Sequence, residues 1–194
     1  MNYDDKCQLL IIGNSTVGKT SILSKYASKM FNENYIATVG LDFFTKDETI
    51  DNKIIRIKIW DTAGQERYKA LTKCFFQKAQ GVMVVFDVTN QKSFDDLKFW
   101  LDSIKTHIYD DDYVPIVIIG NKIDLQKRVV PKKDAIDFAE KNNYHYYETS
   151  AKTGDGVDNA IKELVKSVMN NVGKKNGREN LRLSLNKKKS GKCC

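Results

Sequence analysis

The chain has 194 residues, of which 41% are hydrophobic and 29% charged, and this length and composition predict one globular domain with a buried core. Its longest apolar runs, at residues 7–12 and 82–86, fall well short of the roughly 18 residues that a membrane-spanning helix requires. The formal net charge is +7, but the excess lies in one terminal segment, so we expect no nucleic-acid partner.

The charge is divided sharply along the chain. From Gly173 onward there are eight basic side chains and a single acidic one, whereas residues 1–172 carry the two signs in equal number. We therefore predict a neutral globular domain at residues 1–172 and a disordered basic tail at residues 173–194. Two cysteines, Cys7 and Cys74, lie in apolar stretches and are expected to be buried thiols in a reducing compartment, with no disulfides.

Short apolar runs that favour strands alternate with amphipathic runs that favour helices. The expected strands cover residues 7–12, 41–50, 54–60, 82–88, 115–120 and 144–149, and the expected helices cover residues 20–30, 92–108, 132–143 and 157–172. This alternation predicts a doubly wound α/β fold with a six-stranded, mostly parallel sheet and helices on both faces. The turn signal Asp51-Asn52 is too short for a crossover helix and predicts an antiparallel hairpin at one edge. A ligand is expected outside the carboxyl ends of the parallel strands.

The first motif, GNSTVGKT at residues 13–20, lies between a strand and a helix, as a phosphate-binding loop of the pattern G-x-x-x-x-G-K-[ST] requires. Backbone N–H groups of such a loop surround phosphate oxygens at the helix N-terminus. Lys19 would neutralise the outer phosphates, and the Thr20 hydroxyl would ligate Mg²⁺. The nucleotide contacts expected here are Ser15, Thr16, Val17, Gly18, Lys19, Thr20 and Ser21.

Two further segments are expected to face the phosphates. In WDTAGQER, residues 60–67, Asp61 would hold a metal-bound water, the Gly64 N–H would approach a γ-phosphate, and Gln65 would orient the attacking water as the catalytic residue. The segment before the second strand adds three expected nucleotide contacts, Phe31, Tyr35 and Thr38. Thr38 would complete the magnesium shell, and Phe31 would cover the edge of the base.

The base is expected to be read by NKID at residues 121–124 and TSAK at residues 149–152, each of which follows a strand. Asp124 can accept two hydrogen bonds from guanine N1–H and N2–H₂, whereas adenine presents an acceptor there. The Ala151 N–H would reach guanine O6, with lysine stems packed along the base. The expected base-binding residues are Asn121, Lys122, Asp124, Ser150, Ala151 and Lys152.

In their order and spacing over residues 7–172, the motifs GNSTVGKT, TVGLDF, WDTAGQERY, NKID and TSAK resemble the Rab branch of the Ras superfamily of small GTPases. The resemblance implies a monomeric switch that hydrolyses GTP slowly to GDP and phosphate, uses Mg²⁺ and acts in vesicle trafficking. Thr38 and Gly64 would hold two mobile loops on the γ-phosphate and release them after hydrolysis.

The resemblance also implies partners and a location. The expected partners are an exchange factor, a GTPase-activating protein, a GDP-dissociation inhibitor and effectors that bind at Phe43, Trp60 and Phe75. The protein would be cytoplasmic and cycle to the cytosolic face of an endomembrane compartment. Two positions depart from the family pattern: Thr16 stands where glycine or alanine is usual, and Phe75 where tyrosine is usual.

The sequence ends in KKKSGKCC. A terminal cysteine pair resembles the geranylgeranylation site of Rab proteins, so Cys193 and Cys194 are expected to carry two lipids. Two chains provide the double signal that stable membrane anchoring requires. The neighbouring lysines would add attraction to anionic lipid.

Two other classes of protein would share some of these motifs. A P-loop kinase or ATPase specific for adenine would share GNSTVGKT but has no reason to carry Asp124. A trafficking module that binds nucleotide with negligible hydrolysis would have no need of Gln65 or Thr38, and both are present.

Overall fold

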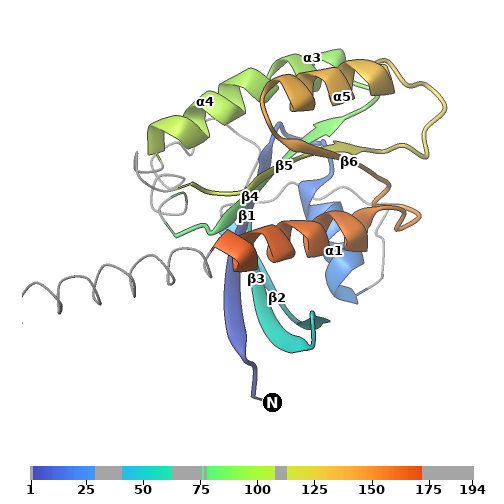
Figure 1. The fold of residues 1–194 in the computed structure, drawn as a ribbon. Coiled ribbons are helices and arrows are strands. Elements are labelled where there is room, and N and C mark those ends of the chain that lie inside the picture. The colour runs from blue at the N-terminus through green and yellow to red at the C-terminus, as the bar shows by residue number, and fades with distance from the viewer. Residues whose placement is uncertain (1, 29–40, 63–75, 77, 108–112, 172–194) are drawn as a thin grey trace, which may run out of the picture.

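The computed structural model describes residues 2–28, 41–62, 76, 78–107 and 113–171, and these form a sheet of six strands between two layers of helices (Figure 1). The strands are β1 Asp5–Gly13, β2 Leu41–Ile50, β3 Lys53–Thr62, β4 Gly81–Asp87, β5 Ile116–Asn121 and β6 His145–Thr149. Their order is β2-β3-β1-β4-β5-β6. The pair β2–β3 is antiparallel, and the other four pairs are parallel. The predicted fold class, with one antiparallel strand at an edge, is confirmed.

The hairpin between β2 and β3 turns at the predicted dipeptide. Asp51 and Asn52 have φ angles of 50° and 63°, the left-handed conformation that a two-residue type I′ turn requires at both positions. The turn pairs Ile50 with Lys53 and so fixes the register along the whole hairpin, in which Phe43 faces Trp60. The turn chemistry therefore determines which side chains meet on the outer strands.

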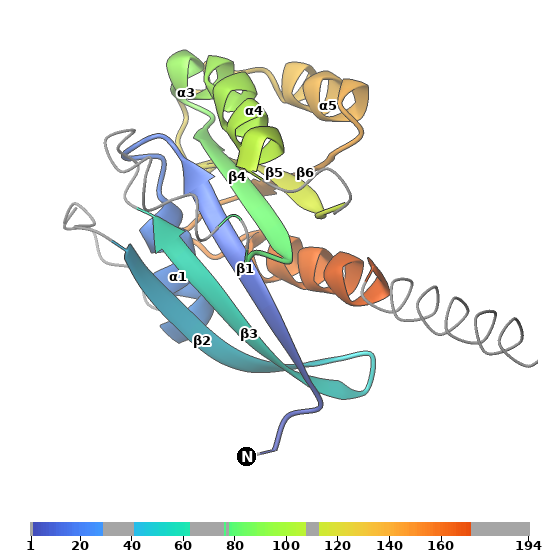
Figure 2. The ribbon, with the colours of Figure 1, turned by 90° about the vertical axis from the view of Figure 1, so that its left-hand side faces the viewer.

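The described helices are α1 Lys19–Ser28, α3 Gln91–Asp95, α4 Leu97–His107, α5 Lys132–Lys141 and a C-terminal helix over residues 157–171. Figures 1 and 2 show α1 and the C-terminal helix on one face of the sheet and α3, α4 and α5 on the other. The single helix predicted over residues 92–108 is divided at Asp96. There ψ is −5° and the backbone N–H points to the carbonyls of Lys92 and Phe94, which tightens the turn.

The two faces of the sheet have separate apolar cores. In β1, Leu9 and Ile11 belong to the core shared with α1 and the C-terminal helix, whereas Leu10 and Ile12 belong to the core shared with α4 and α5. Successive strand residues point to opposite faces, so a strand buried on both sides must be apolar throughout. None of the described helices combines the length and the apolar character needed to cross a membrane.

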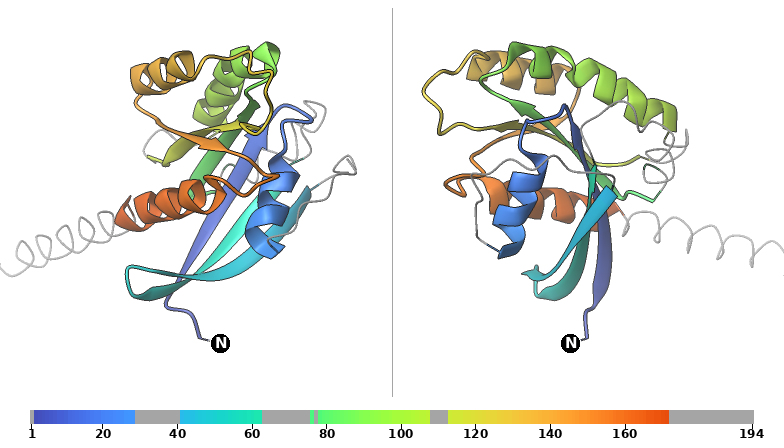
Figure 3. Two further views of the ribbon diagram at one scale, coloured as in Figure 1. Left: turned by 90° about the vertical axis from the view of Figure 1, so that its right-hand side faces the viewer. Right: turned by 180° about the vertical axis from the view of Figure 1, so that it is seen from behind.

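The topology determines where a ligand can bind. Because β1, β3, β4, β5 and β6 run parallel, their carboxyl ends meet at one edge of the sheet. The chain leaves β1 toward β3 on one side and returns to β4 on the other, and such a switch point is where doubly wound sheets bind ligands. Figure 3 shows α1 beginning directly after β1 at this edge.

Candidate functional site

The predicted phosphate loop connects β1 to α1, and two glycines allow its path. Gly13 has a φ of 140°, and a Cβ there would collide with the carbonyl oxygen of Val85 in β4. Gly18 has a φ of 97°, and a Cβ there would collide with the Asn121 amide nitrogen at the end of β5. Both positions therefore need glycine, for conformation and for close approach. Thr16 also adopts the left-handed region, with a φ of 66°, although it is β-branched.

Lys19 is the first residue of α1 and is only 5% exposed. Its ammonium group donates to the carbonyl oxygens of Gly13, at 3.0 Å, and Asn14, at 2.8 Å. Burial lowers the pKa of Lys19 to about 8, and the nearby Asp61 carboxylate partly opposes that shift. The loop thus holds a desolvated ammonium group, whose charged form a bound anion would stabilise.

Asp61 and Thr20 meet beside this lysine. The Thr20 hydroxyl donates to Asp61 Oδ2 at 2.5 Å. The other carboxylate oxygen, Oδ1, is buried and has no hydrogen-bond partner among the residues that the structure describes. Burial raises the pKa of Asp61, while the Thr20 hydrogen bond and the Lys19 charge lower it. A hydroxyl next to a buried, unsatisfied carboxylate oxygen fits a hard cation such as Mg²⁺, which takes oxygen ligands and keeps several waters.

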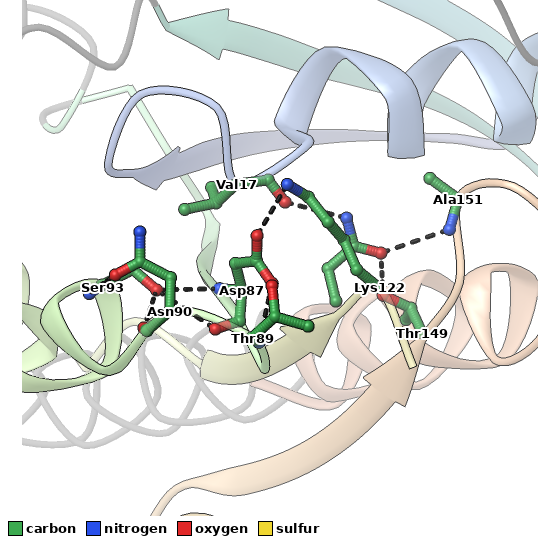
Figure 4. Close-up of polar contacts among 9 residues, drawn as sticks. Val17, Asp87, Thr89, Asn90, Ser93, Lys122, Thr149 and Ala151 are labelled. Carbon is green, nitrogen blue, oxygen red and sulfur yellow. Dashed lines mark hydrogen bonds and ion pairs between the residues drawn. The ribbon is translucent and has the colours of Figure 1, made fainter. Parts of the chain in front are cut away.

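Asn121 joins the phosphate loop to the two base loops through hydrogen bonds to Val17, Thr149 and Ala151, which are labelled in Figure 4. Its side-chain nitrogen donates to the Val17 carbonyl oxygen at 2.8 Å. Its side-chain oxygen accepts from the Thr149 hydroxyl at 3.0 Å and from the Ala151 N–H at 3.2 Å. Thr149 was not among the expected site residues. The Ala151 N–H, expected to reach guanine O6, is therefore directed at Asn121 here.

Lys122 forms an ion pair with an acid that is not among the expected site residues. Its ammonium group lies 2.6 Å from Asp87 Oδ2, at the end of β4 (Figure 4). Asp87 is only 6% exposed and also accepts from the Thr89 N–H and hydroxyl, at 2.8 and 2.7 Å. An acid directly after the buried run VMVVF, at the carboxyl end of a parallel strand, is the signal that would have identified it.

Asp124 and Ser150, two of the expected base-binding residues, are brought together. The Ser150 hydroxyl donates to Asp124 Oδ1 at 2.6 Å. The Thr153 N–H in turn donates to the Ser150 oxygen at 3.0 Å, so the serine is held from both sides. This hydrogen bond fixes the direction of the Asp124 carboxylate. The Lys152 backbone lies beside them and accepts from the Lys25 ammonium group at 3.3 Å.

The expected effector surface is described in part. Phe43 is 50% exposed, and its ring centroid lies 5.3 Å from that of Trp60 on the adjacent strand. The Lys58 ammonium group lies 3.8 Å from the centroid of each ring, a cation–π arrangement. The Lys58 ammonium group thus places a positive charge beside both aromatic rings.

Several expected site residues lie outside the described part of the chain. They are Phe31, Tyr35, Thr38, Gly64, Gln65, Phe75, Cys193 and Cys194. The remaining expected residues of the phosphate and base sites lie at the carboxyl ends of β1, β3, β5 and β6, either in the last residues of these strands, in the loops that follow them or in the first turn of α1. The structure therefore places phosphate-binding and base-binding candidates at one edge of the sheet.

A family model and individual relatives point to the same protein family. Residues 8–170 match the family model described as "Ras family". The chain is 39% identical over 168 residues to Ras-related protein Rab-13 of Canis lupus familiaris, covering 86% of this chain and 82% of the relative. It is 39% identical over 189 residues to Ras-related protein Rab-8 of Diplobatis ommata, covering 97% and 89%. It is 40% identical over 170 residues to Ras-related protein RABA4b of Arabidopsis thaliana, covering 87% and 75%.

Proposed function

The chain belongs to the Ras family as a Rab-type small GTPase that binds guanine nucleotide and hydrolyses GTP in intracellular trafficking, and from this premise we propose which residues perform the switch. The observation that supports the assignment best is the Asn121 side chain. Its hydrogen bonds to Val17 and Ala151 join the phosphate loop and a base loop, so one nucleotide can contact both. A module that binds nucleotide without turnover is not favoured by these relatives.

At the phosphate end, Lys19 and the loop N–H groups of residues 15–21 bind the β- and γ-phosphates. Lys19 already lies in the loop, held by two carbonyl oxygens, so little rearrangement is needed for it to meet an anion. Thr20, Asp61 and Thr38 are the residues that would hold Mg²⁺, with Asp61 acting through a bound water. When bound, the ion neutralises phosphate charge. The Asp61 oxygen that has no partner within the described part of the chain supports this assignment.

At the base end, Asp124 accepts from guanine N1–H and N2–H₂, and Ser150 holds its carboxylate in place. The stems of Lys122 and Lys152 pack along the base, and Asp87 fixes the Lys122 ammonium group. Adenine is rejected because its N1 acceptor would face a carboxylate. Phe31 covers the edge of the base, and Tyr35 contacts the nucleotide.

Hydrolysis is assigned to Gln65, which orients the attacking water with its amide and carbonyl groups. Full-length protein loaded with GTP should release phosphate slowly in a single turnover. Gln65→Leu, which removes both hydrogen-bonding groups, should slow that release further and abolish acceleration by a GTPase-activating protein. If both rates matched those of the unmodified chain, Gln65 would not be the water-positioning residue.

Partner proteins distinguish the GTP-bound from the GDP-bound state. Thr38 and Gly64 hold their loops on the γ-phosphate and release them after hydrolysis. An exchange factor, a GDP-dissociation inhibitor and effectors complete the cycle, with effectors bound at Phe43, Trp60 and Phe75. The Lys58 charge beside the two described rings favours an effector that places an acidic side chain there.

Residues 173–194 act as a membrane tether. Geranylgeranyl chains on Cys193 and Cys194 anchor the protein to the cytosolic face of an endomembrane compartment, and the basic side chains add attraction to anionic lipid. A fluorescently tagged full-length chain should mark one organelle in its own cells, whereas a Cys193→Ser, Cys194→Ser variant should be diffuse. Diffuse signal from both chains, or unmodified cysteines by mass spectrometry, would exclude the lipid anchor.

A further inference from the structure

The second residue of the phosphate loop, Asn14, is held by two side chains from the opposite face of the sheet. Its amide nitrogen donates to Asp96 Oδ2 at 2.7 Å, and its amide oxygen accepts from Trp100 Nε1 at 2.7 Å. Asp96 is the residue that divides α3 from α4, and Trp100 lies one turn further along α4. A carboxylate only accepts and an indole N–H only donates, so the orientation of the amide is fixed.

The same residue contacts the phosphate-binding lysine through its backbone. The Asn14 carbonyl oxygen accepts from Lys19 Nζ at 2.8 Å, the shorter of the two hydrogen bonds that hold this buried ammonium group. A change in the backbone conformation of Asn14 would therefore move a carbonyl oxygen that accepts a hydrogen bond from Lys19. The hydrogen bonds form a continuous path from α4 through Asn14 to the centre of the phosphate loop.

The Asp96 carboxylate is charged in this arrangement. The Asn14 hydrogen bond, and to a lesser degree the Lys92 ammonium group at 3.3 Å, hold the pKa of Asp96 below its ordinary value. A hydrogen bond to a charged acceptor is stronger than one between neutral groups. The contact between Asn14 and Asp96 is therefore a charge-assisted hydrogen bond.

We infer that Asn14 is a positioning residue of the phosphate loop, clamped by Asp96 and Trp100, and that this clamp sets how firmly the loop retains nucleotide. The inference rests on the proposed role of Lys19 in phosphate binding. The clamp needs an amide facing a carboxylate. An acid at residue 14 would still accept from Trp100 but would repel Asp96.

A charge swap tests this requirement. Asn14→Asp, Asp96→Asn and the double variant are prepared as full-length chains loaded with fluorescent GDP, and the GDP dissociation rate is measured together with the thermal unfolding temperature. Asn14→Asp places two carboxylates in contact and should speed GDP release about tenfold, the effect of one lost charged hydrogen bond. The double variant restores the pair with exchanged partners and should return release to within about threefold of the unmodified rate.

Two matched variants complete the experiment. Asp95→Asn removes a neighbouring exposed acid that instead accepts from Gln91, and should leave GDP release unchanged. Trp100→Phe removes the indole N–H while keeping an aromatic ring, and should speed release severalfold. This variant also tests the clamp if Asn14→Asp does not fold.

The inference is overturned if Asn14→Asp releases GDP at the unmodified rate, or if the double variant releases it as fast as Asn14→Asp. It is also overturned if the variants lower the unfolding temperature without changing release, since the clamp would then be structural only. Lys19→Ala separates this result from the proposed function. If that variant kept GDP as tightly as the unmodified chain, the phosphate-loop assignment itself would be wrong.

Discussion

At the scale of single residues, the site depends on side chains that hold other side chains. Asp87 is the clearest case, since a buried carboxylate at the end of β4 fixes the ammonium group of Lys122 at 2.6 Å. Removing one partner of such a pair leaves the other without compensation. The proposed nucleotide contacts follow from motifs, but the supporting residues depend on which strand ends meet.

Asp87→Asn tests this support. The amide keeps the shape and can still accept from Thr89, but it removes the charge that holds Lys122. We expect the affinity for GDP, measured by titration calorimetry, to fall about tenfold, which corresponds to ~1.4 kcal/mol. Asp134→Asn, which neutralises an exposed acid of α5, is the control and should bind GDP normally. Equal affinities for the two variants would exclude a role for Asp87 in holding Lys122.

At the scale of elements, periodicity and turn chemistry were sufficient for the strands and for the hairpin. Strand alternation separates Leu9 from Leu10, and Asp51-Asn52 fixes the turn. The division at Asp96 could not be predicted, because residues 92–108 have continuous helical spacing and the contact that fixes Asp96 comes from Asn14. A helical pattern reports which face is buried and contains no information about a hydrogen bond to a distant loop.

The phosphate loop contains a local conflict that leads to a prediction. Thr16 is β-branched and exposed, yet it has a φ of 66°, where a Cβ costs roughly 1–2 kcal/mol. Thr16→Gly removes that cost. Glycine also raises the conformational entropy of the unfolded chain, which stabilises the unfolded state by about 0.4–1 kcal/mol and so offsets part of the gain. The free energy of unfolding should therefore rise by ~0.5–1 kcal/mol, measured by urea titration at a fixed GDP concentration.

Ser15→Gly is the matched control for this change. Ser15 is the preceding residue of the loop and does not have a positive φ, so glycine there relieves no backbone strain and should lower the free energy of unfolding. If both glycine variants were destabilised to the same extent, relief of the Thr16 backbone would not be the dominant effect.

At the scale of the whole molecule, the excess positive charge and the candidate nucleotide site lie in different parts of the chain. The residues up to 172 carry no net charge, whereas the segment from Gly173 onward carries the whole excess of +7. The fold places the candidate nucleotide site at the carboxyl edge of the sheet, and the composition assigns electrostatic attraction to the tail. Membrane attraction and nucleotide binding are therefore expected to respond to different substitutions.

Replacing Lys187, Lys188 and Lys189 with glutamine tests this separation. The unlipidated full-length chain should bind vesicles containing phosphatidylserine weakly, and the triple variant should bind less, by up to ~1 kcal/mol for each lysine near the surface. The loss should shrink as salt rises, because screening weakens the contribution of each lysine. GDP affinity should not change. The control replaces three exposed lysines of the body, Lys98, Lys105 and Lys133, and should keep both vesicle binding and GDP affinity. If the body variant lost as much vesicle binding as the tail variant, net charge and not the position of the tail would govern attraction to the membrane.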